Sequence, residues 1–121
     1  MLRVIRKQNA ELARTLVELR KAAKSHEAPI WGAVAEKLSR PRHAHPPLNV
    51  GHLDRLAKAE ETIVVPGKVL AQGTLHKPLT VAAFHYSEEA RAKIHGAGGK
   101  TLTIHELIKA KPDGSGVRLL A

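Results

Sequence analysis

The 121-residue chain contains no cysteine, which excludes disulfide bonds and thiolate chemistry and predicts a reducing compartment. It also has no apolar run close to the roughly 18 residues that are needed to cross a membrane. The N-terminus has the pattern of a charged helix rather than the apolar centre of a signal sequence. These absences together predict a cytoplasmic protein.

Aromatic residues other than histidine are almost missing, because Trp31, Phe84 and Tyr86 are the only three. The hydrophobic content is nevertheless 43%, so the core must be built from aliphatic side chains, and wholesale disorder is not expected. The length is that of one ordinary domain. The sequence therefore predicts one compact domain with an aliphatic core.

Acidic residues are also scarce, since 11 Asp and Glu stand against 20 Lys and Arg, which gives a formal net charge of +9. A surplus of this size is typical of proteins that bind a polyanion. The surplus is uneven, with ten Lys and Arg against four Glu in residues 1–47 and ten against seven acids in residues 48–121. We expect the polyanion to meet the N-terminal part most strongly.

The N-terminal part reads as two helices followed by a linker. Apolar residues at helical spacing predict an amphipathic helix over residues 3–24. Pro29 suits the first position of a second helix, because its missing N–H needs no partner there. Three prolines in Arg40–Pro47 predict an extended basic linker, and a short third helix is expected after Asn49.

Beyond residue 60 the pattern changes to short strands separated by turns and helices. Residues 62–65 predict a strand, Pro66-Gly67 a turn, and residues 68–70 a further strand or bend. Residues 80–84 predict a buried strand, and a last strand is expected at residues 117–120.

Two further helices are predicted from their caps. Ser87 is expected to cap one helix, which ends at Gly98-Gly99. Thr103 and Glu106 have capping-box spacing at the start of another, which Pro112 ends. The alternation indicates an α/β core over residues 48–121, preceded by a helical and basic region over residues 1–47.

Several stretches in order along the chain resemble the archaeal and eukaryotic large-subunit ribosomal protein family L-eighteen-e, which is related to bacterial L-fifteen. They are Ala28-Pro29-Ile30-Trp31, Arg40-Pro41-Arg42, Leu48-Asn49-Val50, Val64–Leu70, Leu79–Phe84, Ser87, Ala90–Gly99 and Gly114–Arg118. The resemblance implies an α/β domain of short irregular β-β-α units and a role in binding and organising large-subunit ribosomal RNA beside other ribosomal proteins. The chain departs from the family where His43–Pro47 replaces a denser arginine run, and where Gly51 stands at an expected serine cap.

With this resemblance, the basic residues become candidate RNA contacts, since cations that neutralise phosphates dominate affinity for RNA. Arg40 and Arg42 lie on a proline-stiffened linker, Lys68 follows the predicted turn, and Trp31 could stack on a base. The candidate RNA-binding residues are Arg3, Lys7, Arg14, Lys21, Lys24, Trp31, Arg40, Arg42, His43, Lys68, Lys77 and Arg118.

Other chemistries have little support in the sequence. His43 and His45 alternate in the linker, but no cysteine or convergent set of ligands accompanies them, so no metal and no cofactor is expected. No catalytic triad or carboxylate pair is recognisable, so an enzyme is not expected. Two alternatives stay open: a free-standing nucleic-acid-binding module, and an enzyme with a pocket near His85, Ser87 and His105.

Overall fold

The computed structural model describes residues 2–40 and 47–120, and the side chains of residues 2–9 lie outside that description. The described residues form five helices and five strands, in a compact α/β arrangement with an N-terminal helix, as predicted. In chain order these are α1 Leu2–Ser25, α2 Pro29–Leu38, β1 Leu48–Asn49, α3 Val50–Leu56, β2 Thr62–Leu70, β3 Thr80–Tyr86, α4 Glu88–Gly96, β4 Lys100–Thr103, α5 Ile104–Ala110 and β5 Val117–Leu119.

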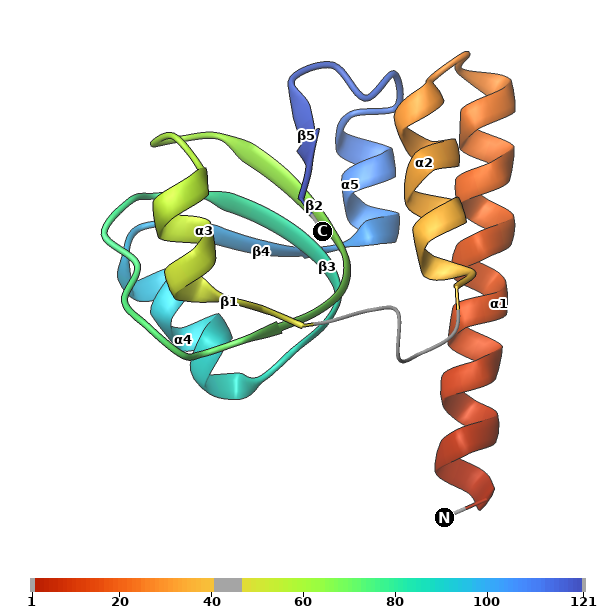
Figure 1. The fold of residues 1–121 in the computed structure, drawn as a ribbon. Coiled ribbons are helices and arrows are strands. Elements are labelled where there is room, and N and C mark those ends of the chain that lie inside the picture. The colour runs from red at the N-terminus through yellow and green to blue at the C-terminus, as the bar shows by residue number, and fades with distance from the viewer. Residues whose placement is uncertain (1, 41–46, 121) are drawn as a thin grey trace.

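The five strands form one parallel sheet in the order β1-β2-β3-β4, and β5 pairs with β2 on the same edge as β1. The two short strands divide that edge: β5 pairs with residues 62–64 and β1 with residues 69–70. Helices cover both faces of the sheet, with α3 and α4 on one side and α1, α2 and α5 on the other (Figure 1).

Side chains in successive positions of β2 alternate between the two faces, as the pleat of a strand requires. Ile63 and Val65 pack in one core cluster, which α3 and α4 cover with Leu53 and Ile94. Val64 belongs to the second cluster, which α1, α2 and α5 cover. Each fully buried aliphatic side chain of this kind stabilises the fold by about 1.5–3 kcal/mol.

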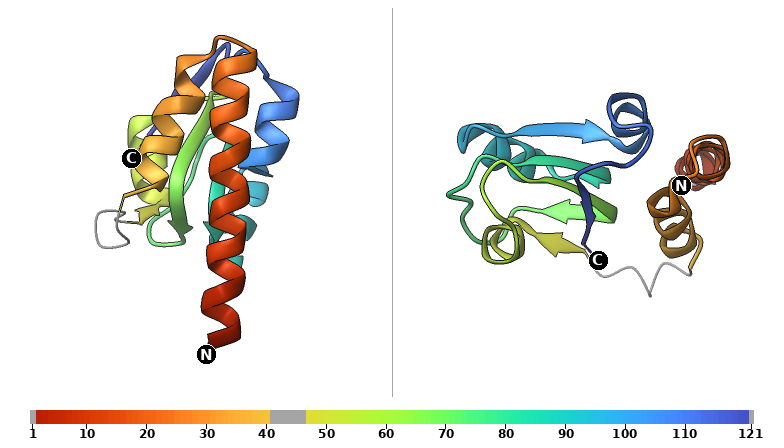
Figure 2. Two further views of the ribbon diagram at one scale, coloured as in Figure 1. Left: turned by 90° about the vertical axis from the view of Figure 1, so that its right-hand side faces the viewer. Right: turned by 90° about the horizontal axis from the view of Figure 1, so that it is seen from above.

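The N-terminal helices belong to this second core rather than lying apart from it. Leu19 of α1 and Trp31, Val34 and Leu38 of α2 are all at most 1% exposed and pack in the same cluster as Val64. The predicted boundary between residues 47 and 48 stays a prediction. Residues from both sides of that boundary contribute to this core. The N-terminal end of α1 extends past the sheet, and the rest of the helix lies beside α2 and α5 (Figure 2).

The local helix signals were confirmed. Pro29 begins α2, the Ser87 hydroxyl accepts a hydrogen bond from the Ala90 N–H at the start of α4, and Thr103 and Glu106 form the capping box of α5. Gly98, with φ +86°, follows the end of α4, as a glycine C-terminal signal should.

Two local predictions were wrong. Pro66-Gly67 is not a turn: residues 62–70 form one strand, and the pair falls at a bulge where the register with β3 shifts between Val65 and Lys68. Gly51 does not occupy a cap position, because Asn49 is the N-cap of α3. A Cβ at residue 51 would lie 3.2 Å from the Cα of Gly73, so close backbone approach explains this glycine.

Candidate nucleic-acid interface

The solvent side of α1 carries basic residues spaced along about three turns. Arg14, Arg20, Lys21 and Lys24 are all exposed, and Val17, which lies among them on the helix, is 61% exposed. An amphipathic helix turns its polar face away from the core, and here that face contains no acid between residues 14 and 24 other than Glu18. We define the basic face of α1 as the exposed residues Arg14, Arg20, Lys21 and Lys24.

The two acidic residues of α1 point toward the sheet instead. A carboxylate oxygen of Glu11 lies 3.8 Å from Nε2 of His85, which follows the buried part of β3. The carboxylate of Glu18 contacts Nδ1 of His105, near the start of α5. Both carboxylates lie toward the sheet, beside the basic face, and Arg14, Arg20, Lys21 and Lys24 keep an excess of positive charge on the solvent side of α1.

Two other predicted cations are also exposed. Arg40 lies just after α2 and pairs with Glu36 at 3.3 Å, an exposed i,i+4 pair of small energetic value. Lys68 follows the bulge of β2 and is in register with His85 of β3. Neighbouring residues in register point to the same face of a sheet, so Lys68 lies on the side that α1 covers.

Four predicted contacts lie outside the described residues and side chains. The side chains of Arg3 and Lys7 lie outside the description, although both residues belong to the helical backbone of α1. Arg42 and His43 lie in residues 41–46, outside the described residues. Their contact with RNA stays a prediction.

Base stacking by Trp31 is contradicted by its position in the fold. Its side chain is 0% exposed, in the cluster under α1 and α2, and its indole N–H donates to the carbonyl oxygen of Pro112 at 2.8 Å. Both ring faces are therefore covered, and the single polar atom of the side chain is satisfied. The residue stabilises the packing of α2 and is removed from the RNA-binding set.

Lys77 and Arg118 are engaged with the backbone near the end of α3. The ammonium of Lys77 donates to the carbonyl oxygens of Asp54 and Ala57, the latter at 2.7 Å. Arg118 donates to the carbonyl oxygen of Leu56 at 3.0 Å and lies 3.3 Å from the Glu61 carboxylate. Cations at this end of a helix satisfy its last carbonyls and its dipole, which gives both residues a structural role.

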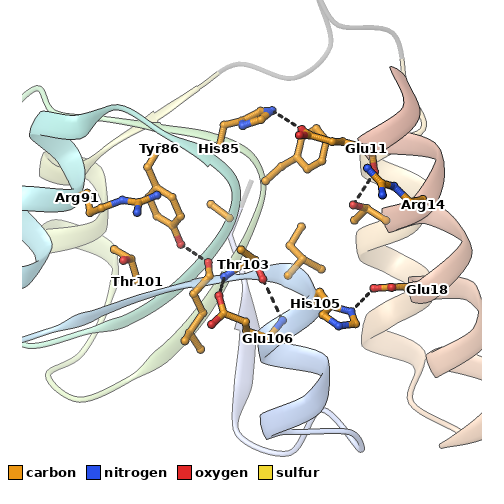
Figure 3. Close-up of a pocket in the computed structure, with 15 residues that line it drawn as sticks. Glu11, Arg14, Glu18, His85, Tyr86, Arg91, Thr101, Thr103, His105 and Glu106 are labelled. Carbon is orange, nitrogen blue, oxygen red and sulfur yellow. Dashed lines mark hydrogen bonds and ion pairs between the residues drawn. The ribbon is translucent and has the colours of Figure 1, made fainter. Parts of the chain in front are cut away.

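A groove of about 510 Å³ lies between α1 and the carboxyl ends of β3 and β4 (Figure 3). Its lining combines acids, arginines, histidines and threonines with a smaller number of apolar side chains. The lining residues are Glu11, Arg14, Thr15, Glu18, Ala83, Phe84, His85, Tyr86, Arg91, Thr101, Leu102, Thr103, Ile104, His105 and Glu106.

Tyr86 lines this groove beside Arg91 (Figure 3). Its hydroxyl lies 2.6 Å from the carbonyl oxygen of Val81 and 2.7 Å from that of Leu102, either of which can accept its single proton. Burial raises the pKa of Tyr86 above its usual range, so the phenol stays neutral. The guanidinium of Arg91 lies 5.4 Å from the centre of its ring, within the range of a cation–π contact.

The groove matches only part of the enzyme alternative, which placed a pocket near His85, Ser87 and His105. His85 and His105 line it, but Ser87 does not, and the Ser87 hydroxyl is occupied as the cap of α4. Within the described ranges, no group of three or more His, Asp or Glu side chains could hold a metal ion. Each histidine instead contacts a glutamate of α1, which is an arrangement that joins the helix to the sheet.

Arg20 and Arg91 were not among the contacts predicted from the sequence. Arg20 could have been found, because it falls on the same helical side as Lys24 and Val17. Arg91 could not, since its place beside the groove depends on the packing of α4 against β4 and on the ring of Tyr86. In addition, none of the helices in the described part of the chain is both long and apolar enough to span a membrane.

Comparison with known proteins gives a consistent family. The family model described as ribosomal protein 60S L18 and 50S L18e matches residues 3–121. Large ribosomal subunit protein eL18 of Methanopyrus kandleri is 49% identical over 117 residues, which cover 93% of this chain and 92% of that protein. The protein of the same name from Archaeoglobus fulgidus is 45% identical over 116 residues, covering 96% of this chain and 99% of the relative.

A third relative, large ribosomal subunit protein eL18 of Methanoregula boonei, is 39% identical over 120 residues, 99% of each chain. The family match and these three alignments extend over both the helical N-terminal part and the sheet. The chain therefore belongs to the family of ribosomal proteins 60S L18 and 50S L18e.

Proposed function

We propose that this protein is a structural constituent of the large ribosomal subunit, where it binds and organises large-subunit ribosomal RNA and contacts neighbouring ribosomal proteins. The family supports the placement in the subunit. The observation that carries RNA binding is the basic face of α1, from which both acids of the described helix turn away. We propose no catalytic role and no cofactor.

The proposed contacts follow from exposure and charge. Arg14, Arg20, Lys21 and Lys24 would face phosphates along α1, with Arg40 and Lys68 extending the surface. Arg3, Lys7, Arg42 and His43 are proposed from the sequence pattern as additional contacts. Lys77 and Arg118 stay proposed as further contacts, although some of their donors already bind backbone carbonyls near the end of α3, and Arg118 also pairs with Glu61.

Binding of this kind is strongly dependent on salt, because each neutralised phosphate releases counterions. With roughly 6–10 phosphate contacts, the affinity for a large-subunit RNA fragment should fall by about 10³–10⁵ between 50 and 200 mM salt. The test is co-sedimentation of the protein with large subunits in a sucrose gradient, followed by a salt titration of the free protein with RNA.

Two results would contradict the proposal. The first is a protein found only in the supernatant after ribosomes are removed, with an affinity for RNA that does not change with salt. The second is equal competition by duplex DNA and ribosomal RNA without stable association with the subunit, which would favour a free-standing nucleic-acid-binding module.

A further inference from the structure

The groove beside α1 has a lining of both charges, which restricts what it can bind. Glu11, Glu18 and Glu106 supply acceptors, while Arg14 and Arg91 supply donors from opposite walls (Figure 3). A strongly basic peptide would leave the two arginines beside a like charge, and a simple anion would meet three carboxylates. A ligand that carries an anionic group and also hydrogen-bond donors would satisfy both sets.

The two arginines are available for a phosphate. Both are exposed, and among the described residues neither forms an ion pair. Arg14 belongs to the basic face of α1 and also lines the groove. Arg14 therefore connects the basic face with the groove, between Glu11 and Glu18 of the same helix.

The interior of the groove offers surfaces for a planar base. The rings of Phe84 and His85 have centroids 4.5 Å apart at a tilt of 54°, and both line the groove with Tyr86. Proteins recognise unpaired RNA bases by stacking them on aromatic side chains or on arginine planes. A groove of about 510 Å³ is more than large enough for one base.

The carboxylates of the groove indicate which RNA base it can bind. A carboxylate has about four lone-pair positions, so the contact of Glu18 with His105 leaves acceptor capacity unused. Among the RNA bases, guanine presents two adjacent donors, N1–H and the N2 amino group, on its pairing edge, which one carboxylate can accept together. Adenine presents a donor beside an acceptor there, and that acceptor would face the negative charge.

We propose that this groove binds an unpaired guanosine nucleotide of the RNA, with its phosphate at Arg14, beside the basic face, and its base edge at Glu18. The inference rests on the proposed function and adds a specific contact to a surface that otherwise holds the RNA by charge. Phosphate contacts position a protein on RNA, whereas contacts to base edges provide selectivity.

The first experiment is an NMR titration of the full chain with guanosine, adenosine, cytidine and uridine 5′-monophosphates at neutral pH. Guanosine monophosphate should shift the amide signals of His85, Tyr86, Thr101 and His105, and bind about five- to tenfold more tightly than the adenosine form. Equal shifts by all four nucleotides, or shifts confined to the basic face of α1, would overturn the proposal.

The second experiment separates the base contact from the phosphate contact. Glu18→Gln should abolish the preference for guanosine, because the amide replaces one acceptor by a donor, while the matched change Glu89→Gln on exposed α4 should preserve it. Arg14→Ala should weaken all four nucleotides by a similar factor and keep their order, and Lys109→Ala on α5 should change nothing. Thermal unfolding of each variant shows whether its fold is intact.

These outcomes distinguish the inference from the proposed function. A protein that binds ribosomal RNA with steep salt dependence but shows no nucleotide preference contradicts the groove proposal alone. Loss of RNA binding in every assay contradicts both proposals. An arginine-rich octapeptide that shifts the groove amides while guanosine monophosphate does not would identify the groove as a protein-binding site and overturn the inference.

Discussion

The basic residues of α1 and those around the sheet differ in what surrounds them. On α1, Lys21 and Lys24 point to solvent while the acids of the helix turn to the groove. Around the sheet, the ammonium of Lys93 donates to the carbonyls of Ala71 and Gly73 at 2.6 and 2.7 Å, and Lys77 binds carbonyls in the same way. The comparison shows that some exposed basic residues bind the protein's own backbone, whereas those of α1 point their donors to solvent.

The largest expected effect comes from the residue of α2 that the sequence assigned to RNA. Trp31→Ala should lower the free energy of unfolding by about 3–5 kcal/mol, because it empties the centre of the core under α1 and α2. Urea denaturation of the variant measures this loss. Trp31→Phe is the matched variant and should cost less, about 1 kcal/mol, since it loses mainly the hydrogen bond to Pro112. A stable Trp31→Ala protein with weakened RNA binding would contradict the assignment to the core.

A smaller loss should follow when a bound cation of the sheet region is removed. Lys77→Met keeps the aliphatic stem but leaves the carbonyls of Asp54 and Ala57 without their donor. The expected cost is about 1–3 kcal/mol in unfolding free energy, with a change of less than about one in the salt slope for RNA binding. A changed salt slope without a loss of stability would show that contact with RNA, and not the bonds to these carbonyls, is the main role of Lys77.

The same substitution on α1 should have the opposite result. Lys21→Met should change the unfolding free energy by no more than about 0.5 kcal/mol, because the side chain is exposed. It should reduce the slope of log affinity against log salt by about one, as the loss of one phosphate contact requires. Filter binding of a large-subunit RNA fragment at four or more salt concentrations measures the slope, with Lys109→Met on α5 as the control.

The smallest effect concerns acid stability. The pKa of Asp54 is lowered first by the hydrogen bond from the backbone N–H of His76, and that of Glu106 by the backbone N–H of Thr103. A lowered folded-state pKa means that this stabilisation is present above the unfolded pKa and is lost as the pH falls through the folded value. The Tm should therefore decrease as the pH is lowered below about 4.

Glu106→Gln tests this directly, because the amide oxygen can still accept from the N–H of Thr103 but carries no charge. The Tm of the variant should depend slightly less on pH between 6 and 3 than that of the unchanged protein. An identical pH dependence would show that the charge of Glu106 contributes nothing to the capping box.

Much of the helical structure could be predicted because its signals are local. Ser87 and Thr103 accept hydrogen bonds within three residues of their own positions, so the sequence contains both partners. Pro66-Gly67 was misread because a strand bulge and a turn share that composition. Whether residues 62–70 form one strand or two depends on β1 and β5, which lie in other parts of the sequence and pair with the two halves of β2.

Only the part of the candidate site that depends on charge and helical spacing could be predicted from the sequence. The basic face of α1 follows from the periodicity of one helix, and so Arg14, Lys21 and Lys24 could be selected in advance. The groove could not, because it depends on Glu18 meeting His105 across 87 positions of sequence. For Trp31 the prediction from the sequence was wrong. An aromatic residue type suggested an interface with RNA, whereas the packing of the helices places the side chain in the core.

The division of one edge of β2 between two short partners has a consequence for the protein before it meets RNA. Sheet edges with unpaired backbone groups invite other strands to add to them. Here the strands at the outer edges are β1, β5 and β4, which are only two, three and four residues long. Such brief edges give a second molecule little length on which to form a ladder, so a basic protein awaiting its polyanion is protected from self-association and aggregation.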